Sequence, residues 1–317
     1  MMTRLTVTLF GAGLLFASAC ADEKQAQAQT APVVEDTASS TPEPSTTGPS
    51  TPVIPSNEDD WRDIDLENTL YITTVYGTFI IEMAPEFAPN HVAQIKTLAR
   101  QKFYDDITFH RVIDGFMNQT GDPKGDGTGD SSLPNIQAEF TFRRASDMVV
   151  SVFGKELSTD GEVDTGFYKS FPIATKPIIQ TMLTKDGKVE AWGLHCKGTT
   201  SMARGGSDIN SGNSQFFLMR GEYTSLNQNY SIWGMTVWGR ENLTRIQVGE
   251  IGTTPNFIPD TMLSMRVAAD VPEADRIPVQ VLKIDSDAFK NYMESLRSSS
   301  GKLPKACDVV VPSRLKP

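Results

Sequence analysis

A single arginine within an apolar stretch is the residue of this sequence best suited to chemistry. Arg111 lies in the segment Phe109-His110-Arg111-Val112-Ile113, and Phe116, Met117 and Gln119 follow closely. A guanidinium is permanently charged and presents its donors as a rigid fork, so an apolar strand carries one at a cost unless a ligand uses it. A cation beside apolar side chains and a neutral amide suits a neutral ligand with carbonyl oxygens better than it suits phosphate. The pattern predicts a peptide-binding groove.

Other reactive residue types are spaced in ways that support neither a metal site nor a nucleophile. The chain has only three histidines and no close pair of them, so His110 and His195 are expected to be buried and hydrogen-bonded, and no metal is predicted. The Gly-Asp-Gly-Thr-Gly run at 125–129 lacks the Lys-Ser/Thr of a phosphate loop and is expected to be a turn. No Gly-x-Ser-x-Gly motif indicates a serine hydrolase.

Three cysteines bear on compartment and stability. Outside the cytoplasm, Cys196 and Cys307 could form a disulfide, and closing a loop of that size contributes on the order of 4–5 kcal/mol in the chain-entropy model. Two unpaired buried thiols are the alternative, and the sequence favours neither. A redox protein using this pair is a weaker functional alternative.

The N-terminus has the pattern of an export signal. Arg4 precedes an apolar core from Leu5 to Phe16, which is short for a membrane span, and Ala17-Ser18-Ala19 supplies the small residues of a cleavage site. Cys20 follows directly, as in a bacterial lipobox. Residues 1–19 are therefore predicted to be a signal peptide, and Cys20 is predicted to be lipidated and to attach the chain to a membrane. Plain secretion with cleavage near Ala19 or Ala21 is the alternative.

Residues 20–64 are poor in large apolar side chains and rich in Gln, Ala, Thr, Pro, Ser and Glu, so a disordered tether is expected. Ala21, rather than aspartate, after the lipidated cysteine favours the periplasmic side of the outer membrane by analogy with enteric lipoproteins.

The net charge of −10 argues against nucleic acid as a partner. The chain is expected to be a monomer.

Short strands separated by turns, with only two helices among them, predict a mainly β fold. The expected elements are two strands around Gly77, a helix, the Arg111 strand, three further strands, a short helix and a closing strand, at 70–83, 88–102, 109–111, 199–204, 214–218, 231–238, 241–248 and 279–284. This succession predicts a closed antiparallel barrel.

Two segments do not fit that succession. Residues 143–194 are an insertion without recognisable chemistry, with a predicted hairpin from Thr181 to Trp192 that turns at Asp186-Gly187. Residues 286–317 are predicted to form a C-terminal helix and a tail, because apolar side chains recur at helical spacing over 286–296.

Two blocks of sequence resemble the cyclophilin-type peptidyl-prolyl isomerases. The first runs from Phe103-Tyr104-Asp105-Asp106 through the Arg111 segment to Gly121-Asp122-Pro123 and the Gly-Thr-Gly at 127–129. The second is Gly198-Thr199-Thr200-Ser201-Met202-Ala203-Arg204, followed by Asn213-Ser214-Gln215-Phe216-Phe217. The likeness covers 66–142 and 195–285, and two long blocks in the right order are far more specific than a short motif. It implies an isomerase domain over 65–285 that is a closed eight-stranded barrel capped by two helices.

The resemblance also implies roles for individual residues. Arg111 corresponds to the catalytic arginine, and Gln119 would hydrogen-bond a substrate carbonyl during catalysis. The proline pocket would consist of Phe116, Met117, Phe217 and Leu226. The other substrate-binding positions are Ala203, Arg204, Gly205, Gln215 and Tyr230; many relatives have asparagine in place of Arg204 and histidine in place of Tyr230.

The implied function is a peptidyl-prolyl cis-trans isomerase without a cofactor. It would accelerate X–Pro rotation in unfolded or partly folded envelope proteins, whose proline-containing segments would be its partners. A non-catalytic peptide-binding or chaperone module on the same fold is the alternative. The intact set of Arg111, Phe116, Gln119 and Phe217 favours the enzyme, because a scaffold does not need all four.

Overall fold

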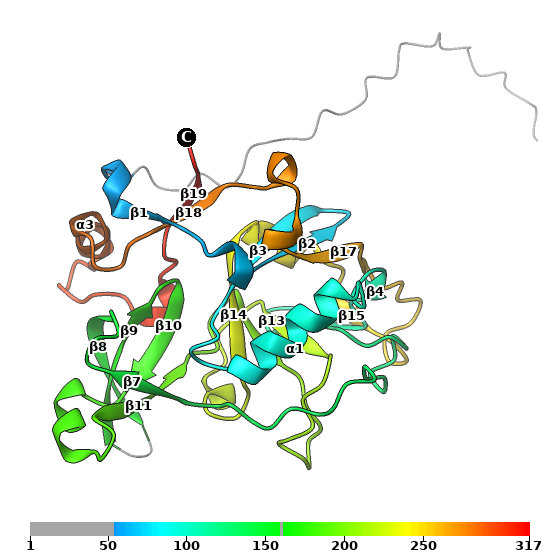
Figure 1. Cartoon of the computed structure of the whole chain (residues 1–317), viewed down its shortest axis with the longest axis horizontal. Helices are drawn as coiled ribbons and strands as arrows, with labels where there is room; N and C mark the ends of the chain where they lie inside the picture. The colour runs from blue at the N-terminus through cyan, green and yellow to red at the C-terminus, as the bar shows by residue number, and fades with distance from the viewer. Residues whose placement is uncertain (1–53, 159–160) are drawn as a thin grey trace, which may run out of the picture. The chain divides into compact units, whose positions relative to one another are not determined.

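The computed structural model describes residues 54–158 and 161–317 (Figure 1). The predicted signal peptide at 1–19, the predicted lipidation site Cys20 and most of the predicted tether lie outside the described residues. Within them the fold is mainly β, as predicted, with three antiparallel sheets of nine, five and three strands and one pair of short strands.

The nine-stranded sheet carries the residues predicted to do chemistry. Its strands, in spatial order, are β15 (Gly249–Glu250), β5 (Arg111–Ile113), β6 (Met117–Thr120), β13 (Phe216–Met219), β12 (Thr199–Met202), β14 (Ile232–Trp238), β3 (Gly77–Met83), β2 (Thr69–Thr74) and β17 (Ser264–Val267). Alternate side chains of β2 and β3, such as Leu70, Ile72, Phe79 and Ile81, lie in one core. Helix α1 (Pro89–Arg100) and helix α2 (Arg240–Arg245) contribute apolar side chains to that core.

The closed eight-stranded barrel is not confirmed. The sheet has nine strands, and within the described part of the chain no ladder joins its edge strands β15 and β17. A short ladder between β4 (Ile107–Thr108) and β16 (Thr261–Met262) connects the segments that lead into β5 and β17. The sheet is therefore curled, and its two edges are joined only through these neighbouring segments.

The insertion forms a sheet of its own. Its strands, in spatial order, are β7 (Phe142–Ala145), β11 (Lys188–Gly193), β10 (Phe171–Thr175), β9 (Gly161–Tyr168) and β8 (Ser151–Ser158). The hairpin predicted from Thr181 to Trp192 is wrong. Residues 178–183 form a 3-10 helix, η3 (Ile178–Leu183), and β11 pairs with β10 and β7 instead. Val189 and Ala191 of β11 are buried, whereas most of η3 is exposed, so the two halves of the expected hairpin have different environments.

The smallest sheet joins the two ends of the described chain. It consists of β1 (Trp61–Asp63), β18 (Val279–Leu282) and β19 (Ser313–Leu315), which lie together in Figure 1. Two boundaries change as a result: part of the predicted tether is a strand with a buried Trp61, and the strand expected to close the barrel belongs to this sheet. The large sheet ends with β17.

The predicted C-terminal helix is present as α3 (Asp287–Ser295). The Ser286 hydroxyl accepts a hydrogen bond from the Phe289 amide at 3.1 Å and so caps the helix. Phe289 and Met293 pack against Trp61 and Val281, so α3 is docked on the small sheet. The remaining short helices are η1 (Glu58–Asp60), η2 (Leu66–Asn68), η4 (Thr224–Leu226), η5 (Ala268–Asp270), η6 (Glu273–Asp275) and η7 (Ala306–Asp308).

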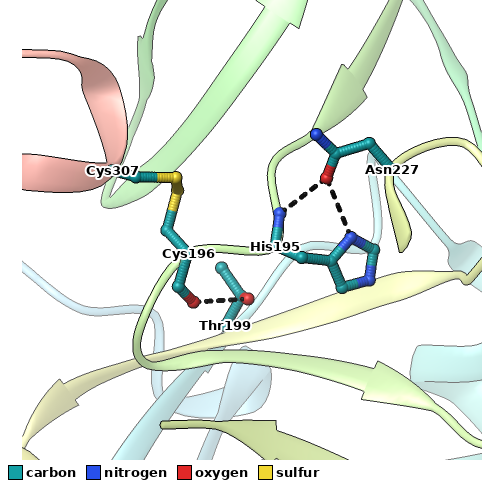
Figure 2. Close-up of a disulfide and its surroundings, with 5 residues drawn as sticks. All are labelled: His195, Cys196, Thr199, Asn227 and Cys307. Atoms are coloured by element: carbon teal, nitrogen blue, oxygen red, sulfur yellow. Dashed lines mark hydrogen bonds between the residues drawn. A yellow bond between two sulfur atoms is a disulfide. The ribbon is translucent and has the colours of Figure 1, made fainter. Parts of the chain in front are cut away.

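A disulfide joins the C-terminal segment to the loop before β12. Cys196 and Cys307 are bonded, with Cα atoms 4.9 Å apart and a sequence separation of 111 residues (Figure 2). The sequence left this pair open between a disulfide and two thiols. Trp192, Leu194 and Ala306 pack around the bond, so the tail is part of the folded structure.

Candidate active site

The residues predicted to bind and rotate a peptide lie together on the nine-stranded sheet. A hollow of about 140 Å³, here called the apolar pocket, is lined by Arg111, Phe116, Met117, Gln119, Ala203, Arg204, Phe217, Leu226 and Tyr230. A second hollow of about 260 Å³, here called the polar pocket, shares Gln119, Ala203 and Arg204 with it and adds Gly205 and Gln215. Every residue predicted for the groove thus lines one of two adjoining pockets.

The strand register explains why distant residues meet. Arg111 of β5 lies opposite Gln119 of β6, and Gln119 lies opposite Phe217 of β13. The row continues at both ends, with Glu250 opposite Arg111 and Ser201 opposite Phe217. Directly opposed residues in antiparallel strands point to the same face, so the row places the cation, the amide and the aromatic ring on one face of the sheet.

Two side chains hold the Arg111 guanidinium. Its Nε lies 3.1 Å from Glu250 Oε1, and its Nη1 donates a hydrogen bond to Gln119 Oε1 at 3.4 Å. Nη2 takes part in neither contact. The side chain is about one-third exposed, so its remaining donors can reach a ligand in the apolar pocket.

The amides of Gln119 and Gln215 form a chain across the polar pocket. Gln119 Nε2 donates to Gln215 Oε1 at 3.0 Å, and Gln215 Nε2 donates to the carbonyl of Gly129 at 2.8 Å. Asp122 organises the glycine-rich turn by accepting hydrogen bonds from the amides of Lys124 and Gly127. The run at 125–129 therefore serves as a backbone acceptor that fixes Gln215.

The apolar pocket has a buried floor and partly buried walls. Met117 and Phe217 are buried, while Phe116, Leu226 and Tyr230 are partly buried and pack against them. The rings of Phe217 and Tyr230 meet edge to face at 5.5 Å between centroids. Such a slot, lined largely by apolar side chains, suits a small apolar ring.

Three residues beside the site were not assigned a role from the sequence. Glu250 contacts Arg111, the Tyr223 ring lies 4.3 Å from the Phe116 ring, and His195 lies 6.2 Å from the Phe217 ring, between centroids. No short-range pattern marks these residues, because their contacts with Arg111, Phe116 and Phe217 are made between segments that are separated in sequence.

The histidines only partly match the expectation that they are buried and hydrogen-bonded. His195 is buried and bonded to Ser201 and Asn227, and burial lowers its pKa to about 4. His110 is buried and its pKa is lowered by burial, but neither ring nitrogen has a hydrogen-bond partner among the described residues. Within the described part of the chain, no cluster of three or more His, Cys, Asp or Glu side chains could hold a metal ion.

Comparison with known proteins connects this site to one family. The model of the cyclophilin type peptidyl-prolyl cis-trans isomerase/CLD family matches residues 69–267. A probable peptidyl-prolyl cis-trans isomerase of Brucella suis is 31% identical over 220 residues, which is 65% of this chain and 85% of that protein. Peptidyl-prolyl cis-trans isomerase B of Bacillus subtilis is 29% identical over 170 residues, which is 54% of this chain and 83% of the relative.

A solved structure shows the same relationship in three dimensions. The crystal structure of cyclophilin AquaCyp293 from Hirschia baltica superposes with a TM-score of 0.72 and 36% sequence identity. The superposition covers 81% of this chain and 93% of the other, a larger share of this chain than residues 69–267. The likeness therefore extends beyond the segment that the family model matches.

Proposed function

This chain belongs to the cyclophilin-type peptidyl-prolyl cis-trans isomerases, and we propose that Arg111 performs the isomerisation by stabilising a twisted X–Pro bond above the apolar pocket. The family establishes the reaction. The proposal concerns the residues that carry it out.

The chemistry requires stabilisation of a rotated amide and no covalent step. An X–Pro bond rotates over a barrier of about 20 kcal/mol, because rotation removes amide resonance. In the twisted state the proline nitrogen is pyramidal and more basic than in the planar amide. A cationic donor directed at that nitrogen binds the twisted state better than the planar one, which is the condition for catalysis.

The position of the Arg111 guanidinium is the observation that carries the proposal. Glu250 and Gln119 contact Nε and Nη1, and Arg111 lines the apolar pocket, so the donors not used in these two contacts can reach a ligand there. Gln119 gives its carbonyl oxygen to Arg111 and one N–H to Gln215, so its second N–H can donate to a substrate carbonyl.

A single hydrogen bond from Arg111 does not account for the whole acceleration. An acceleration of about 10⁵ corresponds to a barrier lowered by about 7 kcal/mol. A hydrogen bond to a charged group contributes about 1.5–3 kcal/mol. The remainder must come from positioning the bound peptide in the groove beside Arg111 and from removing water around the reacting amide.

Replacing Arg111 tests this assignment. In a protease-coupled assay with a proline-containing tetrapeptide, Arg111→Ala is expected to lower kcat/KM by about 10²- to 10³-fold, the usual effect of removing one preorganised donor. Arg143→Ala is a matched control, because Arg143 is an exposed arginine of the insertion that pairs with Asp186. Equal rates for wild type and Arg111→Ala would instead favour a non-catalytic peptide-binding module.

We also propose that the chain is exported, lipidated at Cys20 and held at the periplasmic side of the outer membrane, where as a monomer it assists the folding of envelope proteins. The lipobox-like sequence and the Cys196–Cys307 disulfide support an oxidising compartment. Among the described residues, none of the helices has the length and apolar character needed to cross a bilayer. Labelling with a fatty-acid analogue and membrane fractionation of wild type and Cys20→Ser test the anchor. Release of the wild type into the soluble fraction would contradict it.

A further inference from the structure

We infer that His195, fixed by the Cys196–Cys307 disulfide, is a positioning residue for the walls of the apolar pocket. This inference rests on the proposed function, because it assumes that this pocket holds the proline ring. It assigns to the C-terminal segment a part in substrate binding, although that segment lies outside the part that the family model matches.

The His195 imidazole uses both of its nitrogens. Nδ1 lies 3.0 Å from Asn227 Oδ1, and Nε2 lies 2.9 Å from Ser201 Oγ (Asn227 and His195 appear in Figure 2). An amide oxygen only accepts, so Nδ1 carries the proton and donates, and Nε2 accepts from the Ser201 hydroxyl. The backbone amide of His195 donates to the same Asn227 oxygen at 2.9 Å. The ring orientation is therefore determined from two sides.

These bonds place the imidazole against two aromatic side chains that line the pocket, Phe217 of its floor and Tyr230 of its walls. Its ring is stacked against Phe217, with an angle of 20° between the planes, and meets Tyr230 at 79° with centroids 6.4 Å apart. Ser201, which donates to the imidazole, is also the cross-strand neighbour of Phe217. Displacement of His195 would therefore move two of the rings that line the pocket.

The backbone of His195 supports the remaining walls. Its carbonyl accepts a hydrogen bond from the Tyr223 amide at 2.9 Å, and the Tyr223 ring lies against Phe116. Asn227, bonded to His195, directly follows Leu226. Phe116 and Leu226 both line the apolar pocket, so His195 is connected, directly or through one neighbour, to four of the side chains that line it: Phe116, Phe217, Leu226 and Tyr230.

The disulfide fixes the residue that follows His195. Cys196 is buried, and its carbonyl accepts a hydrogen bond from Thr199 Oγ1 at 2.8 Å (Figure 2). Its sulfur is bonded to Cys307 of η7, beside the fully buried Ala306. The turn that carries His195 is therefore held by a segment more than a hundred residues away in sequence.

Loss of this support should weaken substrate binding more than turnover. Among the described residues, Arg111 and its partners Glu250 and Gln119 make no hydrogen bond, ion pair or ring contact with His195, so the catalytic donor stays in place when the pocket walls move. We expect KM to rise about 3- to 10-fold with kcat changed less than about twofold, the pattern of lost uniform binding.

The experiment compares KM and kcat for a proline-containing tetrapeptide in the full chain and its variants. His195→Gln, Asn227→Ala and the double variant Cys196→Ser/Cys307→Ser should each show the raised KM. His91→Gln is the matched control, because His91 is equally buried and bonded to Glu139 but lines neither pocket. Circular dichroism verifies that each protein is folded at the assay temperature.

An unchanged KM in the folded His195→Gln and disulfide-free variants would overturn the inference, as would a loss confined to kcat. If the disulfide-free variant unfolds, Asn227→Ala decides, because it removes the acceptor of His195 without touching the disulfide. Arg111→Ala is assayed in parallel. Wild-type activity in that variant would refute the proposed function, whereas an impaired Arg111→Ala beside unchanged KM values would refute only the role of His195.

Discussion

At the scale of single residues, Arg111 depends on a neighbour that is itself held in place. Glu250 presents Oε1 to Arg111, while its Oε2 accepts a hydrogen bond from Thr253 Oγ1 at 3.2 Å. The Glu250 amide donates to Thr254 Oγ1 at 3.0 Å. The Glu250 carboxylate is therefore oriented by the turn that follows it, and the carboxylate then orients the Arg111 guanidinium.

The effect of removing that carboxylate should be small. Arg111 and Glu250 are both about one-third or more exposed, and an exposed ion pair contributes about 0–1 kcal/mol. Glu250→Gln is therefore expected to lower kcat/KM by at most about fivefold, measured in the same assay with Glu241→Gln of α2 as the control. A loss well above tenfold would mean that the carboxylate does more than orient Arg111.

His195 predicts a pH dependence of stability. Burial lowers its folded-state pKa to about 4, whereas an unfolded histidine titrates near 6.5. Between these values the unfolded state binds more protons, so the free energy of unfolding rises with pH. The contribution of the neutral His195 to stability is lost as the pH falls from about 6.5 to about 4. Urea unfolding across this window should show a shallower decline for His195→Gln than for wild type. Identical declines would contradict the assignment.

At the scale of elements, the disulfide connects the C-terminal segment to the turn before β12. It closes a long loop across 111 residues, for which the chain-entropy model gives on the order of 4–5 kcal/mol. Cys196→Ser/Cys307→Ser is therefore expected to lower the free energy of unfolding by about 2–5 kcal/mol, measured in urea without reductant. Addition of dithiothreitol should lower the stability of wild type and leave the variant unchanged. Insensitivity of the wild type would mean that the bond contributes nothing.

The elements also show where sequence reasoning succeeds. The β2–β3 hairpin and α1 were predictable, because a turn at Gly77 and a helical period are local signals. The strand at 279–282 was predicted too, but its sheet was not. It pairs with β1 and β19, which include Trp61 and Leu315 and lie near the two ends of the described chain. The periodicity of a sequence does not indicate pairing between such distant segments.

The site divides in the same way. The groove residues were identified because two long blocks resemble a family, and the strand register then places Arg111, Gln119 and Phe217 in one row. Glu250 and His195 lie in segments without such a motif. The roles proposed for them depend on the pairing of β15 with β5 and on the turn held by the disulfide, which are tertiary features.

At the scale of the whole molecule, one buried carboxylate connects the three sheets. Glu82 of β3 accepts two hydrogen bonds from Arg62 of β1, at 2.6 and 2.8 Å, and one from Ser170, which precedes β10. Its side chain is 4% exposed. The apolar core is shared as well, since Phe142 of β7 and Phe171 of β10, both in the five-stranded sheet, pack in the same cluster as Ile81.

This connection predicts that the described residues unfold as one unit. Glu82→Ala removes the acceptor and leaves Arg62 unpaired, so it is expected to cost about 2–4 kcal/mol in a single cooperative transition. Glu190→Ala on β11 is a control without such buried partners. Separate transitions for the insertion and the isomerase sheet, seen by calorimetry in wild type, would contradict this account.

NMR exchange spectroscopy on the bound peptide measures the rate of X–Pro exchange at the site itself, for wild type and Arg111→Lys. A lysine keeps the positive charge but lacks the fork, which contacts Glu250 and Gln119 and still has donors for the ligand. We expect both proteins to bind the peptide with similar Kd and exchange in the bound state to be about 100-fold slower in Arg111→Lys. Equal bound-state exchange rates would show that the Arg111 guanidinium does not stabilise the twisted bond.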